Sequence, residues 1–334
     1  MASSSKQPGI AAKKSVLTPV MTLEGHEPYF APSNHEVKNI SCISYFPDGK
    51  QIISGSGDKT TRRWDLREGK EIKEAREVYK DIVHGVGVSR DGRWVVTAVG
   101  ADSTLLAGGS LDGTVRIWSL DTGKLVAGPF RFSGEQVQVL GLSQDSRKLA
   151  VISGSIYPTC MAQLWLQVWD VRSQKLVGER STPMINVFSL PSIQVFWTTK
   201  GKFITGLFSL YAFYEYDAST LTTVGDSFQG HTGLIRNLAL SFDCLLLASA
   251  SVDNTIKLWS FESRQLLLSF DVQAPFTLIL SPDSHQLAYT TWDEARIHVC
   301  DIPADILTCI GLAKETSGNL AKLLNVRGPA LVLI

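Results

Sequence analysis

The chain repeats itself at a fixed spacing, and this constrains its fold more than any other feature. A short turn built around Asp is followed 16 residues later by an aromatic residue that closes an apolar run, as in Asp48 to Trp64, Asp102 to Trp118 and Asp243 to Trp259. The next turn follows 27 residues after the aromatic residue, as in Trp64 to Asp91, Trp118 to Asp145 and Tyr216 to Asp243. The unit is therefore 43 residues long and has room for four short strands.

Both signals recur along most of the chain. The turns are Pro47-Asp48-Gly49, Arg90-Asp91-Gly92, Ala101-Asp102-Ser103, Gln144-Asp145-Ser146, Thr199-Lys200-Gly201, Phe242-Asp243-Cys244 and Pro282-Asp283-Ser284. The closing pairs are Trp64-Asp65, Trp118-Ser119, Trp169-Asp170, Tyr216-Asp217, Trp259-Ser260 and, in degraded form, Cys300-Asp301. Seven turns and six closings do not match, so one unit is expected to be irregular.

The unit resembles the WD repeat. The resemblance is carried by Gly230-His231 followed by the run from Leu247 to Trp259, and by Gly25-His26 with Ser54, Asp58 and Trp64. It covers about Met21 to Asp301. It implies an all-β propeller of four-stranded antiparallel blades packed radially, which leaves only short protected strand edges.

In this family a His, a Ser or Thr, an Asp and a Trp form hydrogen bonds within each blade. Carried over by position, the best-preserved set is His231, Ser249 or Ser251, Asp253 and Trp259. The corresponding positions in other blades are His26 or His35, Ser54, Asp58, Trp64, Asp112 and Trp118. The role implied for these residues is structural, because buried polar groups need partners.

The irregular unit lies between Asp91 and Asp102, which are 11 residues apart where the repeat predicts 43. Trp94 to Val99 and Thr104 to Gly109 both have the pattern of a second strand. We therefore expect six recognisable blades, one of them malformed around residues 78–119. A deletion from a seven-blade ancestor, a splice form and a misassembled gene product all remain open as the origin.

The ends of the chain complete the predicted organisation. The run Thr18 to Leu23 is expected to supply the outer strand of the last blade and so close the ring. We expect a disordered tail over residues 1–15, the propeller over 16–303, and a C-terminal extension over 304–334. Leu320, Leu323 and Leu324 have helical spacing within that extension, so it can contain a short helix.

Two insertions relative to the 43-residue unit are candidate binding loops. The first contains Tyr29 and Phe30, and the second, Ile156 to Leu164, contains Tyr157. Gly57, Leu111 and Val252 come directly before the Asp of their turns and are expected near the central channel. Since these three residues are small or apolar, they suit a peptide better than a charged ligand.

Composition excludes several classes of function. Lys plus Arg and Asp plus Glu each number 32, so the formal net charge of zero gives no reason to expect nucleic acid or a membrane as partner. Five cysteines without C-x-x-C spacing predict reduced thiols, and no secretory segment is visible at the N-terminus. We expect a cytoplasmic or nuclear protein that is monomeric unless it enters a complex.

No catalytic or metal-binding motif emerges from the sequence. Complete Walker, G-x-S-x-G and G-x-G-x-x-G motifs are absent, and His298 with Cys300 lacks further ligands at suitable spacing. The sequence therefore predicts no enzyme and no cofactor. It favours an interaction scaffold that holds a peptide or loop of a protein partner on the face bearing Asp58, Asp112 and Asp253. The alternatives are a ligand-sensing module of a signalling NTPase-type receptor and a truncated product with impaired function.

Overall fold

The structure of the protein is a computed structural model. It describes residues 14–15, 17–30, 36–37, 40–72, 77–78, 83–88, 95–99, 108–109, 114–118, 125–131, 136–143, 147–156, 161–182, 185–186, 195–198, 201–206 and 211–311. Nearly all regular structure in these ranges is antiparallel sheet, as the resemblance implies.

Five sheets have a path of at least four consecutive strands in the described part of the chain. The first contains β5 (Ile40–Tyr45), β6 (Gln51–Ser56), β7 (Thr60–Asp65) and β8 (Lys70–Glu71), with β9 (Glu77–Val78) also paired to β7. Another contains β15 (Gln136–Leu142), β16 (Lys148–Ile156), β17 (Met161–Asp170) and β18 (Lys175–Ser181), with β19 (Ile185–Asn186) paired to β17. The next contains β20 (Phe196–Trp197), β21 (Lys202–Thr205), β22 (Ala212–Asp217) and β23 (Phe228–Gln229).

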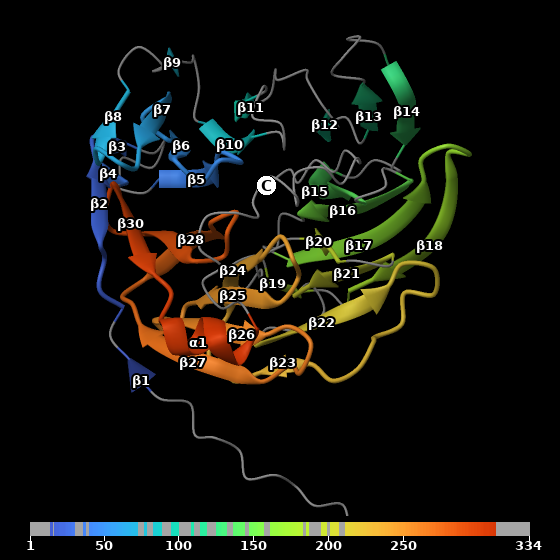
Figure 1. The fold of residues 1–334 in the computed structure, drawn as a ribbon. Helices are drawn as coiled ribbons and strands as arrows, with labels where there is room; N and C mark the ends of the chain where they lie inside the picture. The colour runs from blue at the N-terminus through green and yellow to red at the C-terminus, as the bar shows by residue number, and fades with distance from the viewer. Residues whose placement is uncertain are drawn as a thin grey trace, which may run out of the picture.

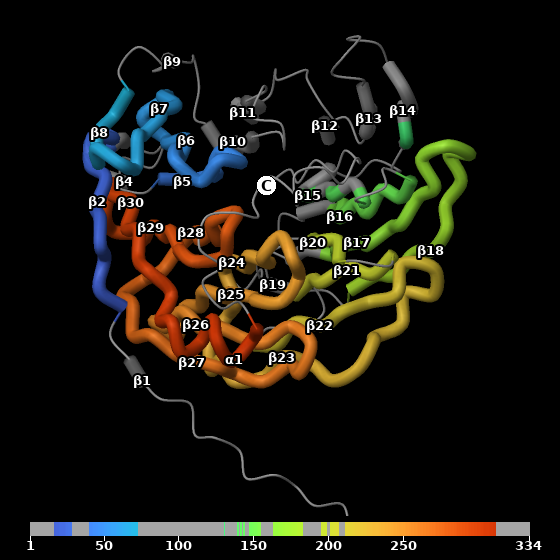
Figure 2. Tube along the Cα trace, viewed as in Figure 1, coloured from blue at the N-terminus to red at the C-terminus, as the bar shows by residue number. Residues whose placement is uncertain are grey.

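The last two of these sheets include segments from the N-terminal part of the chain. One contains β24 (Ile235–Leu240), β25 (Leu246–Ser251), β26 (Thr255–Ser260) and β27 (Leu266–Asp271), and β1 (Lys14–Ser15) pairs in parallel with β27. The other contains β28 (Pro275–Leu280), β29 (Gln286–Thr291), β30 (Arg296–Asp301) and β2 (Met21–Glu24). Met21 pairs with Val299, so the N-terminal segment supplies the outer strand of the last sheet, as the sequence predicts. Figure 2 shows β2 beside β30 at the periphery.

The irregularity between Asp91 and Asp102 is divided between two incomplete sheets. β10 (Val83–Val88) and β11 (Val95–Val99) form a two-stranded sheet. β12 (Gly108–Gly109), β13 (Thr114–Trp118) and β14 (Leu125–Arg131) form a separate three-stranded sheet. We expected the two second-strand runs to compete for one malformed sheet. Instead, each run lies in a sheet of its own. β11 pairs with β10, which precedes it, whereas β12 pairs with β13, which follows it, so the two runs have different hairpin partners.

The sheets follow one another around a central region (Figure 1). β10 packs against β5, β5 against β28, and β28 against β24, while β15 packs against β12 on one side and β20 on the other. Phe213 and Phe228 pack with Trp259 across the boundary that joins β22 and β23 to the sheet of β24–β27. Apolar clusters between neighbouring sheets thus form the core, since no single sheet can bury both of its faces.

Three shorter elements complete the description. β3 (Tyr29–Phe30) and β4 (Glu36–Val37) pair within the first insertion. α1 (Ala304–Cys309) follows β30 directly and buries Ile306 and Leu307. The segment with helical leucine spacing, residues 313–325, lies outside the described residues, as do residues 1–13 of the expected tail.

Candidate functional site

Two sheets contain the same chain of hydrogen bonds between buried side chains. In the β24–β27 sheet, His231 Nδ1–H donates to Asp253 at 2.9 Å, and the Ser249 hydroxyl donates to His231 Nε2 at 2.7 Å. Trp259 Nε1–H donates to the same hydroxyl oxygen at 2.8 Å. Each donor therefore has an acceptor, which buried polar groups require.

The β5–β8 sheet repeats this chain with its own four residues. His26 lies 2.8 Å from Asp58 and 2.7 Å from the hydroxyl of Ser54, and Trp64 Nε1–H donates to that hydroxyl at 2.8 Å. His26 thus occupies the histidine position, and its larger distance in sequence from Trp64 is taken up by the insertion that contains β3 and β4. The competing His35 lies outside the described residues.

Ser251, the second serine near Asp253, forms a different hydrogen bond from Ser249. Ser251 accepts a hydrogen bond from the backbone N–H of Asp253 at 3.1 Å, whereas Ser249 joins His231 to Trp259. Asp253 in turn accepts from the backbone N–H of Thr232 at 2.9 Å. The carboxylate therefore joins the turn between β25 and β26 to the loop before β24, and the two segments form one rigid unit.

A glycine precedes each histidine for a steric reason. Gly230 has φ of 150°, and a Cβ there would lie 3.2 Å from Cη2 of Trp259. Gly25 has φ of 155°, and a Cβ there would lie 2.9 Å from the guanidinium of Arg62. A side chain at either position would meet both an unfavourable backbone conformation and a closely packed neighbour.

Electrostatics favours a neutral histidine beside an ionised aspartate. Burial lowers the pKa of His231 and of His26, and it outweighs the attraction of the neighbouring carboxylates. Burial alone would raise the pKa of Asp253, but hydrogen bonds from His231, Thr255 and Thr232 hold it well below its ordinary value. The neutral imidazole can then donate through Nδ1 and accept through Nε2, as both chains require.

The arrangement of Asp, His and Ser has the residue types of a hydrolase triad but cannot work as one. Ser249 and Ser54 are completely buried, and in each case the hydroxyl oxygen is already occupied by the indole N–H of a tryptophan. A nucleophile must reach the substrate while its base takes the proton. These chains therefore stabilise the turns that carry Asp58 and Asp253. We call the end of the sheets bearing these two turns the Asp face.

The candidate partner-binding residues are only partly described. Val252 is 38% exposed on the Asp face, and Gly57 is buried in its turn. Tyr29 and Phe30 form β3, but their side chains lie outside the description, as does the side chain of Trp118 in β13. Leu111, Asp112 and Tyr157 lie wholly outside the described residues.

The second insertion is largely an extension of a hairpin. Ile156 pairs with Ala162, and the antiparallel pairing of β16 with β17 continues without a break from there to Lys148 and Asp170. Most of this insertion is therefore strand. Residues 157–160, at its tip, lie outside the described residues.

An aromatic cluster on the Asp face is not among the residues predicted from the sequence. Trp292 is 49% exposed, its ring packs edge-on against Phe276 at a centroid distance of 4.8 Å, and the guanidinium of Arg236 lies over it at 5.4 Å. Trp292 directly precedes Asp293, just as Val252 directly precedes Asp253. Extending that sequence rule to the last repeat would have found it. We call Arg236, Phe276 and Trp292 the Arg236 cluster.

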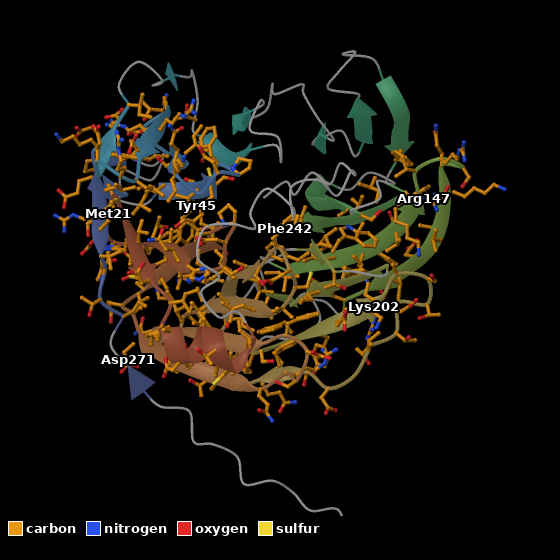
Figure 3. The ribbon with its side chains drawn as sticks, viewed as in Figure 1. Met21, Tyr45, Arg147, Lys202, Phe242 and Asp271 are labelled. Atoms are coloured by element: carbon orange, nitrogen blue, oxygen red, sulfur yellow. The ribbon has the colours of Figure 1, made fainter. Side chains whose placement is uncertain are left out.

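The backbone confirms that these two turns are equivalent. The N–H of Val252 donates to the carbonyl of Leu234 at 2.9 Å, and the N–H of Trp292 donates to the carbonyl of Ala274 at 2.9 Å. Each turn is thereby joined to the start of the inner strand of its own sheet. Phe242, by contrast, lies in the turn at the other end of β24, and Figure 3 shows it toward the middle of the molecule.

A surface pocket adjoins the turn between β29 and β30, which carries Trp292. It has a volume of about 380 Å³ and is lined by Glu24–His26, Pro28 and Asp293–Arg296. Arg296 pairs with Glu24 at 2.9 Å, so part of the carboxylate charge in the pocket is already neutralised. The pocket places the start of the first insertion beside the last sheet.

His298 and Cys300, considered above as metal ligands, do not belong to a metal-binding group in the described part of the chain. Cys300 is buried, and burial raises the pKa of its thiol to about 12. His298 Nε2 lies 3.3 Å from Glu294. Within the described ranges, no group of three or more His, Cys, Asp or Glu side chains is placed to hold a metal ion.

In the part of the chain that the structure describes, no helix has the length and apolar character needed to cross a bilayer.

Comparison with known proteins agrees with the geometry. The family model described as WD domain, G-beta repeat matches residues 17–65, 75–119 and 222–260. The guanine nucleotide-binding protein subunit beta of Zea mays is 23% identical over 256 residues, which cover 74% of this chain and 60% of that protein. The WD40 repeat-containing protein HOS15 of Arabidopsis thaliana is 27% identical over 250 residues, covering 73% of this chain and 36% of that protein.

A third relative is matched along most of its length. The small ribosomal subunit protein RACK1 of Candida albicans is 27% identical over 301 residues, which cover 86% of this chain and 81% of that protein. The match to the maize subunit, in contrast, spans less than two thirds of that protein. The chain therefore contains WD repeats in three places, and the relatives and the antiparallel sheets agree with a fold of this kind.

Proposed function

We propose that this protein is a non-enzymatic interaction scaffold that holds a peptide or loop of another protein on its Asp face. The observation that carries the proposal is the exposed indole of Trp292, which stands on a turn that a backbone hydrogen bond joins to the start of β28. Large exposed aromatic residues on rigid supports are typical of the residues that dominate protein interfaces. Val252 adds an exposed apolar group at the equivalent turn of the neighbouring sheet.

The relatives give independent support. By their names, the maize protein is a subunit of a guanine nucleotide-binding protein and the Candida protein is a component of the small ribosomal subunit. Both are therefore parts of larger assemblies. A fold hosts many functions, so the support from the family is general and the argument for the site rests on Trp292.

Affinity purification from the native source tests the proposal. Wild-type protein is compared with Trp292→Ala and with Phe242→Ala, which removes an aromatic side chain that is 53% exposed at the other end of the sheets. We expect the Trp292 variant to lose proteins that the wild type and the Phe242 variant both retain. Equal recovery with all three proteins would contradict the proposal.

The first insertion is a second candidate contact on the same face. Its start lines the pocket beside Asp293, and Tyr29 and Phe30 belong to it. We propose that it widens the binding surface. Deleting residues 27–34 should then weaken capture of the same partners that depend on Trp292.

The remaining expectations are proposals of the same kind. We propose that residues 16–303 form the interaction domain and residues 304–334 an extension to it. We also propose that the protein acts in the cytoplasm or nucleus, without nucleic acid or membrane as partner, and that it is monomeric outside its complex.

A further inference from the structure

Arg236 is a partly buried cation with no counter-ion among the described residues. It lies near the start of β24, where it is partly covered, and its only described interaction is the contact with the Trp292 ring. The carboxylates on the two flanking turns do not pair with it: Asp253 is held by His231, and Asp293 forms no ion pair in the described part of the chain. Burial lowers the pKa of Arg236, although a guanidinium stays charged at neutral pH.

Three other partly or fully buried cations in the described part of the chain have polar partners. Arg62 pairs with Glu71 at 3.2 Å, Arg264 pairs with Glu215 at 2.7 Å, and Lys257 donates to Ser269 at 2.8 Å. Removing a charge from water without such a partner costs free energy. Arg236 therefore departs from the pattern that these other cations follow.

The aromatic residues around Arg236 hold it in a defined place. The Trp292 ring lies against the guanidinium at 5.4 Å and is itself held by Phe276 at 4.8 Å. Beside these residues, Asn237 joins β24 to β28 through a hydrogen bond to Thr277 at 3.3 Å. The contact with the Trp292 ring is a cation–π interaction, and no hydrogen bond from the guanidinium is described, so its N–H groups remain available to donate.

We propose that the Arg236 cluster binds a segment of a partner protein that presents an Asp or Glu carboxylate next to an apolar side chain. The carboxylate supplies the missing counter-ion in the bidentate geometry that a guanidinium prefers. The apolar side chain covers the exposed part of Trp292, which is the largest exposed apolar group described beside Arg236. This inference rests on the proposed function and specifies the chemistry of the partner.

A phage-displayed library of random peptides tests the proposal even though the partner is unidentified. The library is selected on wild-type protein, on Arg236→Gln and on Trp292→Ala. Arg172→Gln serves as the matched control, because Arg172 is exposed in the turn after β17, away from the cluster. Circular dichroism and thermal unfolding establish that each variant folds.

We expect peptides selected on the wild type and on the Arg172 variant to be enriched in Asp or Glu next to an apolar residue, and this enrichment to disappear with Arg236→Gln. A synthetic copy of the best peptide should lose at least about tenfold in affinity for the wild type when its acidic residue becomes Asn or Gln. The same change should have little effect on binding to the Arg236 variant.

The outcomes separate the two proposals. Peptides that depend on Trp292 but show no acidic preference, or that bind Arg236→Gln equally well, would overturn the carboxylate proposal and leave the proposed function intact. Peptides whose acidic position accepts phosphoserine but not Asp or Glu would also overturn it. Failure to select any peptide on the Asp face would contradict both.

Discussion

Arg264 and Glu215 form an ion pair between neighbouring sheets, with 2.7 Å between Nη2 and Oε2. Glu215 belongs to β22, in the sheet that lacks the His and Trp of the repeat, and it also accepts a hydrogen bond from Thr198 at 3.0 Å. Both charged side chains are largely buried. Packing of this sheet against its neighbour therefore depends on an interaction that the repeat pattern does not contain.

Replacing Glu215 with Ala should strongly destabilise the protein, because Arg264 would remain buried without its counter-ion. We expect the free energy of unfolding to fall by about 3 kcal/mol. Urea unfolding of the single variants and of the double variant with Arg264→Ala measures the coupling between the two residues.

An exposed pair provides the control for this prediction. Arg67 and Glu68 lie 3.2 Å apart, but their side chains are 83% and 56% exposed. Glu68→Ala should change the free energy of unfolding by less than about 0.5 kcal/mol. Equal effects at Glu215 and Glu68 would show that the pair between the sheets is not structurally important.

Ser249→Ala tests the chain of buried hydrogen bonds. It removes the donor to His231 Nε2 and the acceptor of Trp259 Nε1–H at the same time. We expect a loss of about 2 kcal/mol or more, since two buried polar groups are left unpaired. Ser263, exposed in the turn after β26, is the control, and its replacement by Ala should be nearly neutral.

The spacing of the sequence predicts the repeat unit and its four strands. The residues from His231 to Trp259 belong to one repeat, and the resemblance of that repeat to the WD repeat implies the buried network. The ion pair of Arg264 and Glu215 and the contact of Arg236 with Trp292 could not be found in this way, because each joins residues of different sheets. A repeat pattern describes what one sheet does within itself, and contacts between sheets vary with the side chains on both.

Acidification should destabilise the protein in a range set by its buried histidines. Burial lowers the folded-state pKa of His231 below its ordinary value of 6.5, so below pH 6.5 the unfolded chain binds more protons than the folded one. The free energy of unfolding should therefore fall as the pH decreases from 6.5. His231→Gln should make this slope shallower, as measured by urea unfolding from pH 8 to pH 5 in steps of about half a unit.

The aspartates of the same networks act in a separate range. The pKa of Asp253 is held below its ordinary value of 3.8, so its contribution is present above that pH and is lost only on further acidification. A slope that begins near pH 6.5 and persists unchanged in a variant lacking both His26 and His231 would contradict the assignment of these residues.

Gly230→Ala tests why glycine precedes the histidine. The backbone conformation is unfavourable for alanine, and the new Cβ would lie 3.2 Å from Trp259. We expect the melting temperature to fall, with a loss of about 1–3 kcal/mol. Gly311 has φ of 78°, and a Cβ there would meet no atom of the described residues within 4 Å, so Gly311→Ala lacks the steric contact and should cost less.

Hydrogen exchange can establish whether the Asp face receives the partner. Exchange is measured for the free protein and for its complex with a partner recovered by affinity purification. We expect slower exchange on binding in residues 230–236, 251–255 and 291–296, at the turns that carry Val252 and Trp292. Slower exchange confined to residues 241–246 and 281–286, at the opposite ends of the same strands, would contradict it.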